Sequence, residues 1–384
     1  MINSKRAFLI VALSVFSSML GVGIIAPLLP LYAKKMGASG LGIGFLFAGF
    51  SLARTFTMPL SGALSDKRGR KLFLSLGLLS YSLLSLGYIY AQGIVSLIVV
   101  RLLHGTASGM VIPIAQAYVG ELSPAGEEGR WQGYFNTALF SGLGGGPLLG
   151  GLLTDCFGME KAFMAMGLMN FVGFLGVVFL LPEIRKRGKR VSSFPSPLAL
   201  KGRTVMKAVL AFQFAYSVGR GTIIGFLPLL ASMRFGLSPT RIGILVSTIT
   251  LLNSSFQPLG GFLADRLSRT MLVSIGGLAS SVLLALLPLA GSFTGLFLIC
   301  LLLALGGGIS LPSASALVVQ EGRIIGMGVA MSLLGMAFSL GMTVGPLTAG
   351  LIADTLSIEE TFLFACLLSL MGTASFSLLV RRSK

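Results

Sequence analysis

Four basic side chains lie in stretches of sequence that are otherwise apolar. Arg54, Arg101 and Arg220 each fall near the middle of such a stretch, and His104, the only histidine, follows Arg101 by three residues. All twelve acidic residues fall between these stretches or at their ends. A guanidinium in apolar surroundings needs a carbonyl, water or an anion as its partner, and its planar fork of donors suits a carboxylate or a phosphate. The simplest chemistry that these residues predict is recognition of an anionic solute.

His104 and Arg54 each allow a second interpretation. Imidazole titrates near neutral pH, so His104 could respond to a proton gradient, or it could be an ordinary hydrogen-bonding histidine. Arg54 could bond only the carbonyls of its own helix. Because the apolar stretches contain no central Asp or Glu, the proton-carrying group is not evident. A cationic substrate would also meet no opposite charge there.

Uncharged polar and aromatic side chains within the apolar stretches are further candidates for a binding cavity: Asn136, Gln213, Tyr216, Asn253 and Gln257. Bends that act as gates are expected at three prolines: Pro27, Pro30 and Pro228. The cysteines fit no metal or redox spacing: Cys156, Cys300 and Cys366. An enzyme would need a paired acid and base or a metal cluster within the apolar stretches, and the sequence has neither. We therefore expect no catalytic site, no metal and no cofactor.

The elements that position these residues are long apolar segments. The chain of 384 residues is 54% hydrophobic and 11% charged, whereas an ordinary soluble protein is about 25% charged. A membrane-spanning helix needs about 20 mostly apolar residues. Twelve stretches fit: 8–32, 41–64, 72–92, 95–119, 131–154, 162–182, 208–231, 240–264, 271–291, 293–319, 325–353 and 360–380. The sequence therefore predicts an all-α membrane protein of twelve transmembrane helices, with tight hairpins at 92–95 and 291–293.

The basic residues set the expected orientation. If the twelve stretches alternate in direction, most Lys and Arg residues fall on the side that holds both termini. Such residues gather on the cytoplasmic side of membrane proteins, so we expect a multi-pass protein of the cell inner membrane with both termini in the cytoplasm. This distribution also explains the net charge of +17. Basic patches with interleaved aromatic residues are missing, so nucleic acid is not an expected partner.

The longest basic segment is 183–207, which has a single acid, Glu183. Its basic residues are Arg185, Lys186, Arg187, Lys189, Arg190, Lys201, Arg203 and Lys207. We interpret this segment as a cytoplasmic linker that fixes the topology and contacts anionic lipid headgroups. A regulatory role is an alternative that nothing in the sequence supports.

The chain repeats itself across this linker at a constant offset of 199 residues. The matches include Pro59 with Pro258, Gly62 with Gly261, Asp66 with Asp265, Gly109 with Gly308, Gly146-Pro147 with Gly345-Pro346, and Asp155 with Asp354. Each half holds an even number of spans, so the repeats run parallel, a mark of transporters whose substrate site lies near the midplane between halves. We predict six-helix bundles at 1–182 and 208–384, joined by the linker 183–207.

A loop between the second and third stretches carries the most specific motif. It reads Gly62-Ala-Leu-Ser-Asp66-Lys-Arg-Gly69-Arg70-Lys71, and a degenerate copy surrounds Asp265. This motif resembles the signature loop of the major facilitator superfamily, and the resemblance extends over essentially the whole chain.

The resemblance implies a gating role for this loop. Gly62 is expected to let its helix approach a helix of the other half, whose positive N-terminal end Asp66 would then face. Arg70 would pair with an acid at the end of the fourth helix, where Glu121 is well placed. This cluster would latch the outward-facing state. The alternative is that the charges only set the topology and a tight turn.

Two further motifs resemble the twelve-helix drug–proton antiporter branch of the superfamily. The stretch at 95–119 has Arg101 followed by spaced glycines, although Cys300 occupies the equivalent place in the second half. The stretch at 131–154 matches the antiporter motif at Gly142, Gly146, Pro147, Gly150 and Gly151, with a weaker copy at Gly345-Pro346. The resemblance implies a pliable helix that closes against the facing half during exchange. The alternatives are a structural hydrogen-bonding role for Arg101 and generic small-residue packing for the glycines.

The sequence therefore predicts a secondary active transporter that works by alternating access. The favoured function is proton-coupled export, by an antiporter linked to multidrug resistance, of a small organic solute or drug-like compound. The alternative is uptake or exchange of an organic anion that the arginines bind. A receptor or scaffold that has lost transport would have degraded gating motifs, and here the first-half motifs are intact. Expected partners are the substrate and the lipid bilayer, with the chain acting as a monomer.

Overall fold

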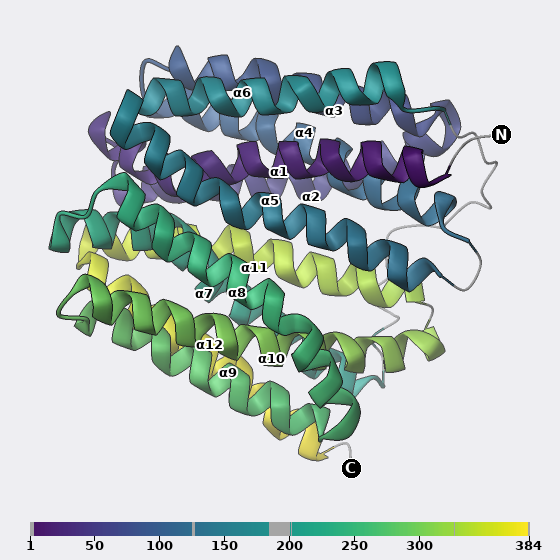
Figure 1. Ribbon diagram of the computed structural model, residues 1–384. Helices are drawn as coiled ribbons and strands as arrows, with labels where there is room; N and C mark the ends of the chain where they lie inside the picture. Colours follow the sequence, from purple (N-terminus) through teal and green to yellow (C-terminus); the bar gives the residue numbers. More distant parts are fainter. Residues whose placement is uncertain (1–3, 125–126, 184–199, 201, 326, 383–384) are drawn as a thin grey trace. The chain divides into compact units, whose positions relative to one another are not determined.

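The computed structural model describes residues 4–124, 127–183, 200, 202–325 and 327–382 (Figure 1). This part of the chain contains no strand and forms twelve long α-helices: α1 Ser4–Lys35, α2 Gly40–Arg68, α3 Arg70–Ile89, α4 Ile94–Leu122, α5 Glu128–Phe157, α6 Met159–Leu175, α7 Thr204–Phe235, α8 Pro239–Arg266, α9 Arg269–Leu286, α10 Phe293–Ile325, α11 Met327–Thr355 and α12 Ile358–Arg382. The predicted all-α fold with twelve helices is confirmed. Both predicted hairpins are present, since only four residues separate the end of α3 at Ile89 from Ile94, and a 3-10 turn, Leu287–Leu289, leads from α9 toward α10.

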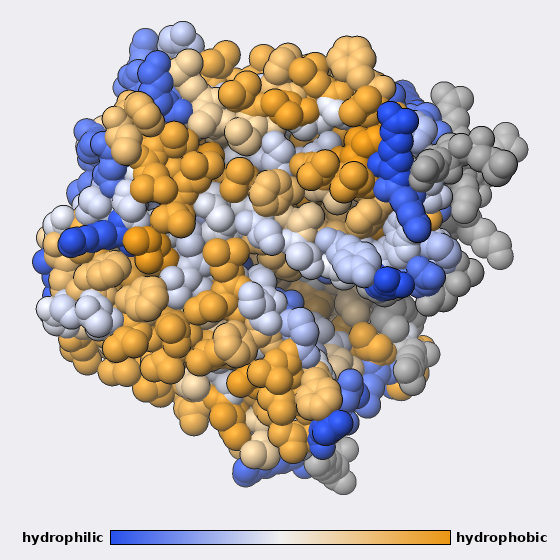
Figure 2. Space-filling model, viewed as in Figure 1, coloured by the Kyte–Doolittle hydropathy of each residue, from blue (hydrophilic) through white to orange (hydrophobic). Residues whose placement is uncertain are grey.

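The helices have the length and surface of membrane spans. Among the described residues, eleven helices are long and apolar enough to cross a membrane. The twelfth is α5, where glycines replace the larger apolar side chains of the other helices. Large apolar side chains such as Leu9, Phe56 and Leu83 are exposed, and Figure 2 shows apolar surface over the middle of the helices, with hydrophilic side chains near their ends. Exposed apolar surface of this extent matches lipid rather than water.

The chain divides into two compact units. Unit 1 comprises Met1–Ala38, Gly49–Val191 and Leu237–Ser247, and unit 2 comprises Ser39–Ala48, Ser192–Gly236 and Thr248–Lys384. Thus α2 contributes its first turns to unit 2 and the rest to unit 1, while α8 is divided in the opposite sense. Most of the predicted linker 183–207 lies outside the described residues, so the bundle boundaries at 182 and 208 stay a prediction.

The two units pack their helices in the same way. In unit 1, α1 packs on α5 and α6, and α3 packs on α4 and α6; in unit 2, α7 packs on α11 and α12, and α9 packs on α10 and α12. Each helix of one set corresponds to its counterpart at the offset of 199 residues. The predicted parallel repeat is therefore present in the packing as well as in the sequence.

Glycines of the α5 motif bring this helix against α1 within unit 1. A Cβ atom added at Gly142, Gly146 or Gly150 would collide with the backbone of α1. In unit 2, a Cβ atom at Gly341 or Gly345 would likewise collide with the backbone of α7. Most of the motif thus serves close packing inside each repeat, as small residues do in membranes. Pro147 and Pro346 lie inside continuous helices, as do Pro27, Pro30 and Pro228.

Candidate functional site

His104 lies in the centre of a basic and aromatic cluster in unit 1. Its side chain, on α4, is fully buried, and Nδ1 lies 2.7 Å from the hydroxyl of Tyr88 on α3. The rings of Phe50, Tyr81 and Tyr88 meet the imidazole edge to face, with centroids 5.4, 4.4 and 5.9 Å away. No described residue hydrogen-bonds Nε2. The imidazole is therefore held in one orientation by aromatic rings and one hydroxyl.

Arg101 lies one turn before His104 and is also buried, with 4% of its surface exposed. Its guanidinium carbon lies 5.0 Å from the centroid of the Phe50 ring, and the side chain interacts with the hydroxyl of Tyr88. A guanidinium over an aromatic face gains a cation–π attraction that grows when water is excluded. Arg101 thus has aromatic partners from α2 and α3, which supports both a structural role and a binding role.

Arg54 completes this cluster from α2. It is half-buried, within electrostatic range of Tyr81, and its Nε has no hydrogen-bond partner among the described residues. Of the sequence candidates in unit 1, the structure therefore brings together Arg54, Arg101 and His104. Asn136 is half-buried on α5, and no hydrogen bond joins it to this cluster among the described residues.

The candidates in unit 2 form an uncharged polar network with one arginine beside it. Nε2 of Gln257 donates to Oδ1 of Asn253 at 3.3 Å, and Nδ2 of Asn253 donates to the carbonyl of Ala304 at 3.4 Å. Tyr216 contacts Asn253 and lies within electrostatic range of Arg220.

Gln213 lies one turn before Ser217 on α7. Its Nε2 donates to the hydroxyl of Ser217 at 3.3 Å. Amide and hydroxyl groups offer both donors and acceptors, so these amides and hydroxyls suit a neutral polar group, and Arg220 is the cationic candidate beside them.

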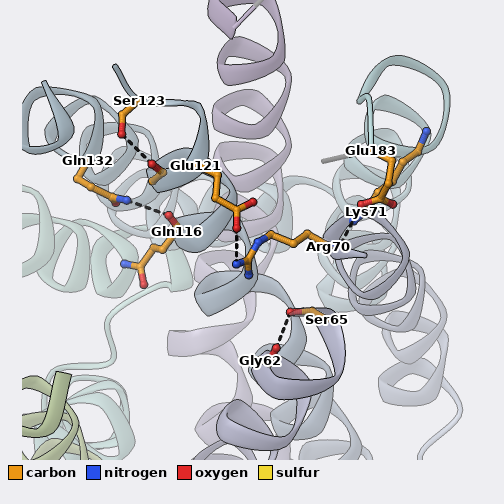
Figure 3. A network of polar contacts seen from close by, with 10 residues as sticks. Gly62, Ser65, Arg70, Lys71, Gln116, Glu121, Ser123, Gln132 and Glu183 are labelled. Atoms are coloured by element: carbon orange, nitrogen blue, oxygen red, sulfur yellow. Dashed lines mark hydrogen bonds and ion pairs between the residues drawn. The ribbon is translucent and has the colours of Figure 1, made fainter. Parts of the chain in front are cut away.

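The loop that carries the signature motif is tied to α4 by an ion pair. Nη2 of Arg70 lies 2.7 Å from Oε1 of Glu121, and their side chains are only 13% and 19% exposed (Figure 3). The pairing that the resemblance suggested is present. A partly buried, charge-assisted hydrogen bond of this length is stronger than an exposed ion pair.

A second acid, which the sequence interpretation assigned only to the linker, holds the same loop. Oε1 of Glu183 accepts hydrogen bonds from the backbone N–H of Arg70 at 3.0 Å and of Lys71 at 3.5 Å (Figure 3). It therefore caps the N-terminus of α3, where N–H groups lack helical partners. Gly69 has φ 103 and leaves no room for a Cβ beside this carboxylate. In the sequence, the Gly69–Arg70 turn could have indicated a helix N-terminus that needs a cap. It could not indicate that Glu183 supplies the cap, because Glu183 lies 113 residues after Arg70.

Two expected features of the signature loop stay predictions or lie outside the description. No described atom lies within 4 Å of a Cβ placed at Gly62, and its expected approach to a helix of the other half stays a prediction. The side chain of Asp66 lies outside the described residues. In the degenerate copy, Asp265 pairs with Arg269 at 3.6 Å, but its side chain is 76% exposed. That pair contributes little, because water screens it.

Family comparison agrees with the fold and the motifs. The model of the Major Facilitator Superfamily matches residues 11–214 and again 209–384. The chain belongs to the major facilitator superfamily. It is therefore a transporter rather than an enzyme, with a small-molecule substrate and a lipid bilayer around its helices.

Several relatives match along almost their whole length. An uncharacterized MFS-type transporter of Methanocaldococcus jannaschii is 29% identical, with 96% of each chain covered. Multidrug resistance protein 2 of Bacillus subtilis is 26% identical, covering 97% of this chain and 94% of that protein. Among solved structures, a bacterial homolog of the human lysosomal transporter Spinster, inward-facing and unoccupied, has a TM-score of 0.85 at 14% identity, covering 99% and 98% of the two chains. At that identity the last likeness concerns the fold alone.

Proposed function

We propose that this protein is a secondary active transporter that exports a small organic solute in exchange for protons. The observation that carries the proposal is the complete α5 motif, with Gly142, Gly146 and Gly150 packed on α1, within a chain that the family model matches throughout. The Bacillus subtilis relative, named for multidrug resistance, supports export of drug-like compounds. The protein would act as a monomer in the cell inner membrane with both termini cytoplasmic. It would need no cofactor, and the proton gradient would supply the energy.

Alternating access would supply the mechanism. The two halves rock about a site near the midplane, and gradient energy couples the two states. The signature loop, fixed by Glu121 and Glu183, would present Asp66 to the helix of the other half and so latch the outward-facing state. Replacing Asp66 with Asn should then reduce transport without loss of membrane insertion. Unchanged transport rates would argue against the latch.

His104 is the candidate for proton coupling, because the predicted spans contain no central carboxylate. Tyr88 holds its Nδ1, and Nε2 has no protein partner among the described residues, so one ring nitrogen remains for a proton or a solute. In this proposal the protonation state of His104 would alternate with substrate occupancy. Replacing His104 with Gln should uncouple solute movement from proton movement.

The proposal can be tested with purified protein in liposomes that contain the pH indicator pyranine. Addition of a transported solute to one side should move protons in the opposite direction and change the indicator signal. Panels of anionic, neutral and cationic solutes are added in turn, with protein-free liposomes as the control. Solute flux without proton movement would contradict proton coupling, and co-directional movement would contradict export by exchange.

Transport of an organic anion is the second candidate, favoured by the charge of the unit 1 cluster. Arg54, Arg101 and His104 gather there without an acidic side chain among the described residues of the cluster. Arginine binds carboxylates and phosphates through parallel hydrogen bonds. The same liposome panels separate the two candidate functions. An organic-anion transporter would give flux of anionic solutes only, and the flux could be uptake as well as export.

A further inference from the structure

Two carboxylates outside the signature loop cap helix N-termini. In unit 2, Asp354 at the end of α11 accepts hydrogen bonds from the backbone N–H of Gly40 and Leu41, the first residues of α2, at 2.6 and 2.8 Å. In unit 1, Asp155 at the end of α5 accepts one from the backbone N–H of Thr240, at the start of α8, at 2.9 Å. The first turn of a helix has unpaired N–H groups and the positive end of the helix dipole, so each carboxylate stabilises it.

The two contacts are copies of one another. The offset of 199 residues that relates Asp155 to Asp354 also relates Leu41 to Thr240. Each contact therefore joins the same pair of elements, taken once from each repeat. An isolated surface hydrogen bond would not be expected to recur at both equivalent positions.

Close backbone contact accompanies each carboxylate. In unit 2, a Cβ added at Gly350 would collide with the carbonyl of Gly40, and in unit 1 a Cβ added at Gly151 would collide with the carbonyl of Pro239. These two pairs are again related by 199 residues. Gly151 is the member of the α5 motif that does not face α1.

A second glycine in each partner helix extends the contact. A Cβ at Gly44 of α2 would collide with the carbonyl of Pro346 in unit 2, and a Cβ at Gly243 of α8 would collide with the carbonyl of Pro147 in unit 1. The carbonyls of the motif prolines therefore lie against glycines of the neighbouring helix. Each carboxylate ends a glycine-lined seam between two backbones: α2 with α11, and α8 with α5.

Both seams join helices from different sequence repeats. The α2 and α5 helices belong to the first repeat, and α8 and α11 belong to the second. Both seams lie at the start of α2 or α8, whereas the signature loop and its copy follow the end of these same helices. A helix of the length of α2, 29 residues, separates its two ends by about 40 Å.

We propose that Asp155 and Asp354 are positioning residues that hold the two seams closed in one state of the transport cycle and release them in the other. This inference rests on the proposed alternating access, in which the repeats rock against each other. A seam that joins the two repeats at one end of the helices can persist in only one of the two states. The signature loop would act at the opposite end in the other state.

The chemistry of the contacts suits reversible closure. Each partner is a helix-terminal N–H or a carboxylate at a helix end, and the contacts to Leu41 and Thr240 are exposed. Water can therefore satisfy both groups when a seam opens. Loss of a side-chain cap usually changes an equilibrium about three- to tenfold, so each carboxylate biases the two states without locking either.

Distances between spin labels test this proposal directly. Labels are attached at Lys35→Cys and Leu356→Cys, two exposed positions, in a chain whose three native cysteines are replaced by Ser. Distance distributions are then recorded in lipid nanodiscs for Asp354→Asn, for Asp155→Asn and for the double variant. We expect a roughly three- to tenfold increase in the ratio of the longer to the shorter distance for each single variant. The double variant should give about the product of the two factors.

The variant Asp155→Asn, which is remote from the labels, decides between the proposal and local damage. Asp155→Asn lies in the other seam, so purely local damage would leave the distance between these labels unchanged. Thr355→Val is the matched control, because within the described part of the chain the Thr355 hydroxyl bonds only to the carbonyl of Leu351 in its own helix, and this variant should leave the distribution as in the parent chain. An unchanged distribution in Asp155→Asn would overturn the proposal, and so would an unchanged distribution in Asp354→Asn.

This experiment does not depend on the substrate or on proton coupling. If the distances shift but solute flux moves no protons, the positioning role of Asp155 and Asp354 stands and proton-coupled export is rejected. If proton-coupled export is normal but the distances do not shift, export stands and the positioning role of the two carboxylates is rejected. Each variant is first checked for monodispersity, and Asp→Asn keeps one acceptor oxygen so that the fold is preserved.

Discussion

Unit 1 and unit 2 share a helical framework but hold different polar groups in it. At the offset of 199 residues, Arg54, Arg101 and His104 of unit 1 correspond to Asn253, Cys300 and Leu303 of unit 2. Cys300 is fully buried and Leu303 nearly so, which means that uncharged side chains, with Asn253 as the one polar member, occupy the three places of the basic cluster. The glycines, prolines and helix-capping aspartates that set the packing are instead alike in both units.

This difference separates two kinds of position. Residues that let backbones touch are needed twice, because both units use the same packing. Residues of the polar layer are free to differ, since a substrate or a proton needs a given group only once. Substitutions at packing positions should therefore harm both units alike, whereas substitutions in the polar layer should harm one unit more than the other.

The largest expected effect concerns packing. Gly146→Leu and Gly345→Leu would each drive a side chain into the backbone of the neighbouring helix. No rotamer relieves a collision with backbone, so each variant should lose about 3 kcal/mol or more and most of the folded protein. The measurement is the monodisperse fraction in size-exclusion chromatography.

Matched controls for these variants lie on the same two helices. A Cβ at Gly133 of α5 or at Gly335 of α11 meets no described atom within 4 Å. Gly133→Leu and Gly335→Leu should therefore fold normally. If one repeat tolerated its packing variant and the other did not, the equivalence of the two frameworks would be wrong.

The next effect separates the polar layers. Arg101→Ala removes the guanidinium that lies on the Phe50 ring and should lower solute affinity at least tenfold, by about 1.5–3 kcal/mol for a charged hydrogen-bonding group. Cys300→Ala, at the equivalent place in unit 2, should change affinity less than twofold. Solute titrations of both variants would measure this, and equal losses would contradict the asymmetry.

A smaller effect is expected at the two signature loops. Arg70→Ala breaks the partly buried pair with Glu121 and should lower stability by about 1–3 kcal/mol, because it also leaves a carboxylate without its partner. Arg269→Ala breaks an exposed pair and should cost at most about 1 kcal/mol. Thermal unfolding of both variants gives the comparison. A larger loss for Arg269→Ala would reverse our ranking of the two loops.

The smallest effect concerns the N-termini of α3 and α9. Glu183→Gln removes the charge that caps α3 and should cost about 1 kcal/mol. The corresponding cap of α9 is the hydroxyl of Ser268, 3.4 Å from the backbone nitrogen of Met271, and Ser268→Ala should cost about half as much. Hydrogen exchange at the first turn of each helix would measure the difference. Equal increases in exchange in both variants would contradict the prediction that the Glu183 cap stabilises its helix more than the Ser268 cap does.

Much of the framework could be predicted from the sequence, because lipid imposes simple rules. Apolar runs of spanning length predicted all twelve helices, and the repeat offset predicted which helices correspond. The Arg70–Glu121 pair followed from the family motif. These features depend on local composition or on motifs that lie in short segments.

Other features depend on distant partners that no local pattern reveals. Glu183 was assigned to the linker because its partners, the N–H groups of α3, lie more than a hundred residues earlier. The aromatic neighbours of Arg101 come from two other helices, so an arginine expected to seek an anion already has partners in the protein. The α5 helix was expected to close against the facing half during exchange, which stays a prediction. Its glycine spacing predicts close packing but not the partner helix: Gly142, Gly146 and Gly150 pack on α1, whereas Gly151 meets the start of α8.

The most direct test of a solute site in the basic cluster of a transporter is a thermal-shift measurement on purified protein. The parent chain, Arg101→Ala and Arg220→Ala are each melted with panels of anionic, neutral and cationic solutes, since a ligand raises the melting temperature according to its occupancy. We expect solute to stabilise the parent chain, Arg101→Ala to lose this stabilisation and Arg220→Ala largely to keep it. Stabilisation that persists in Arg101→Ala would contradict it and return Arg101 to a structural role.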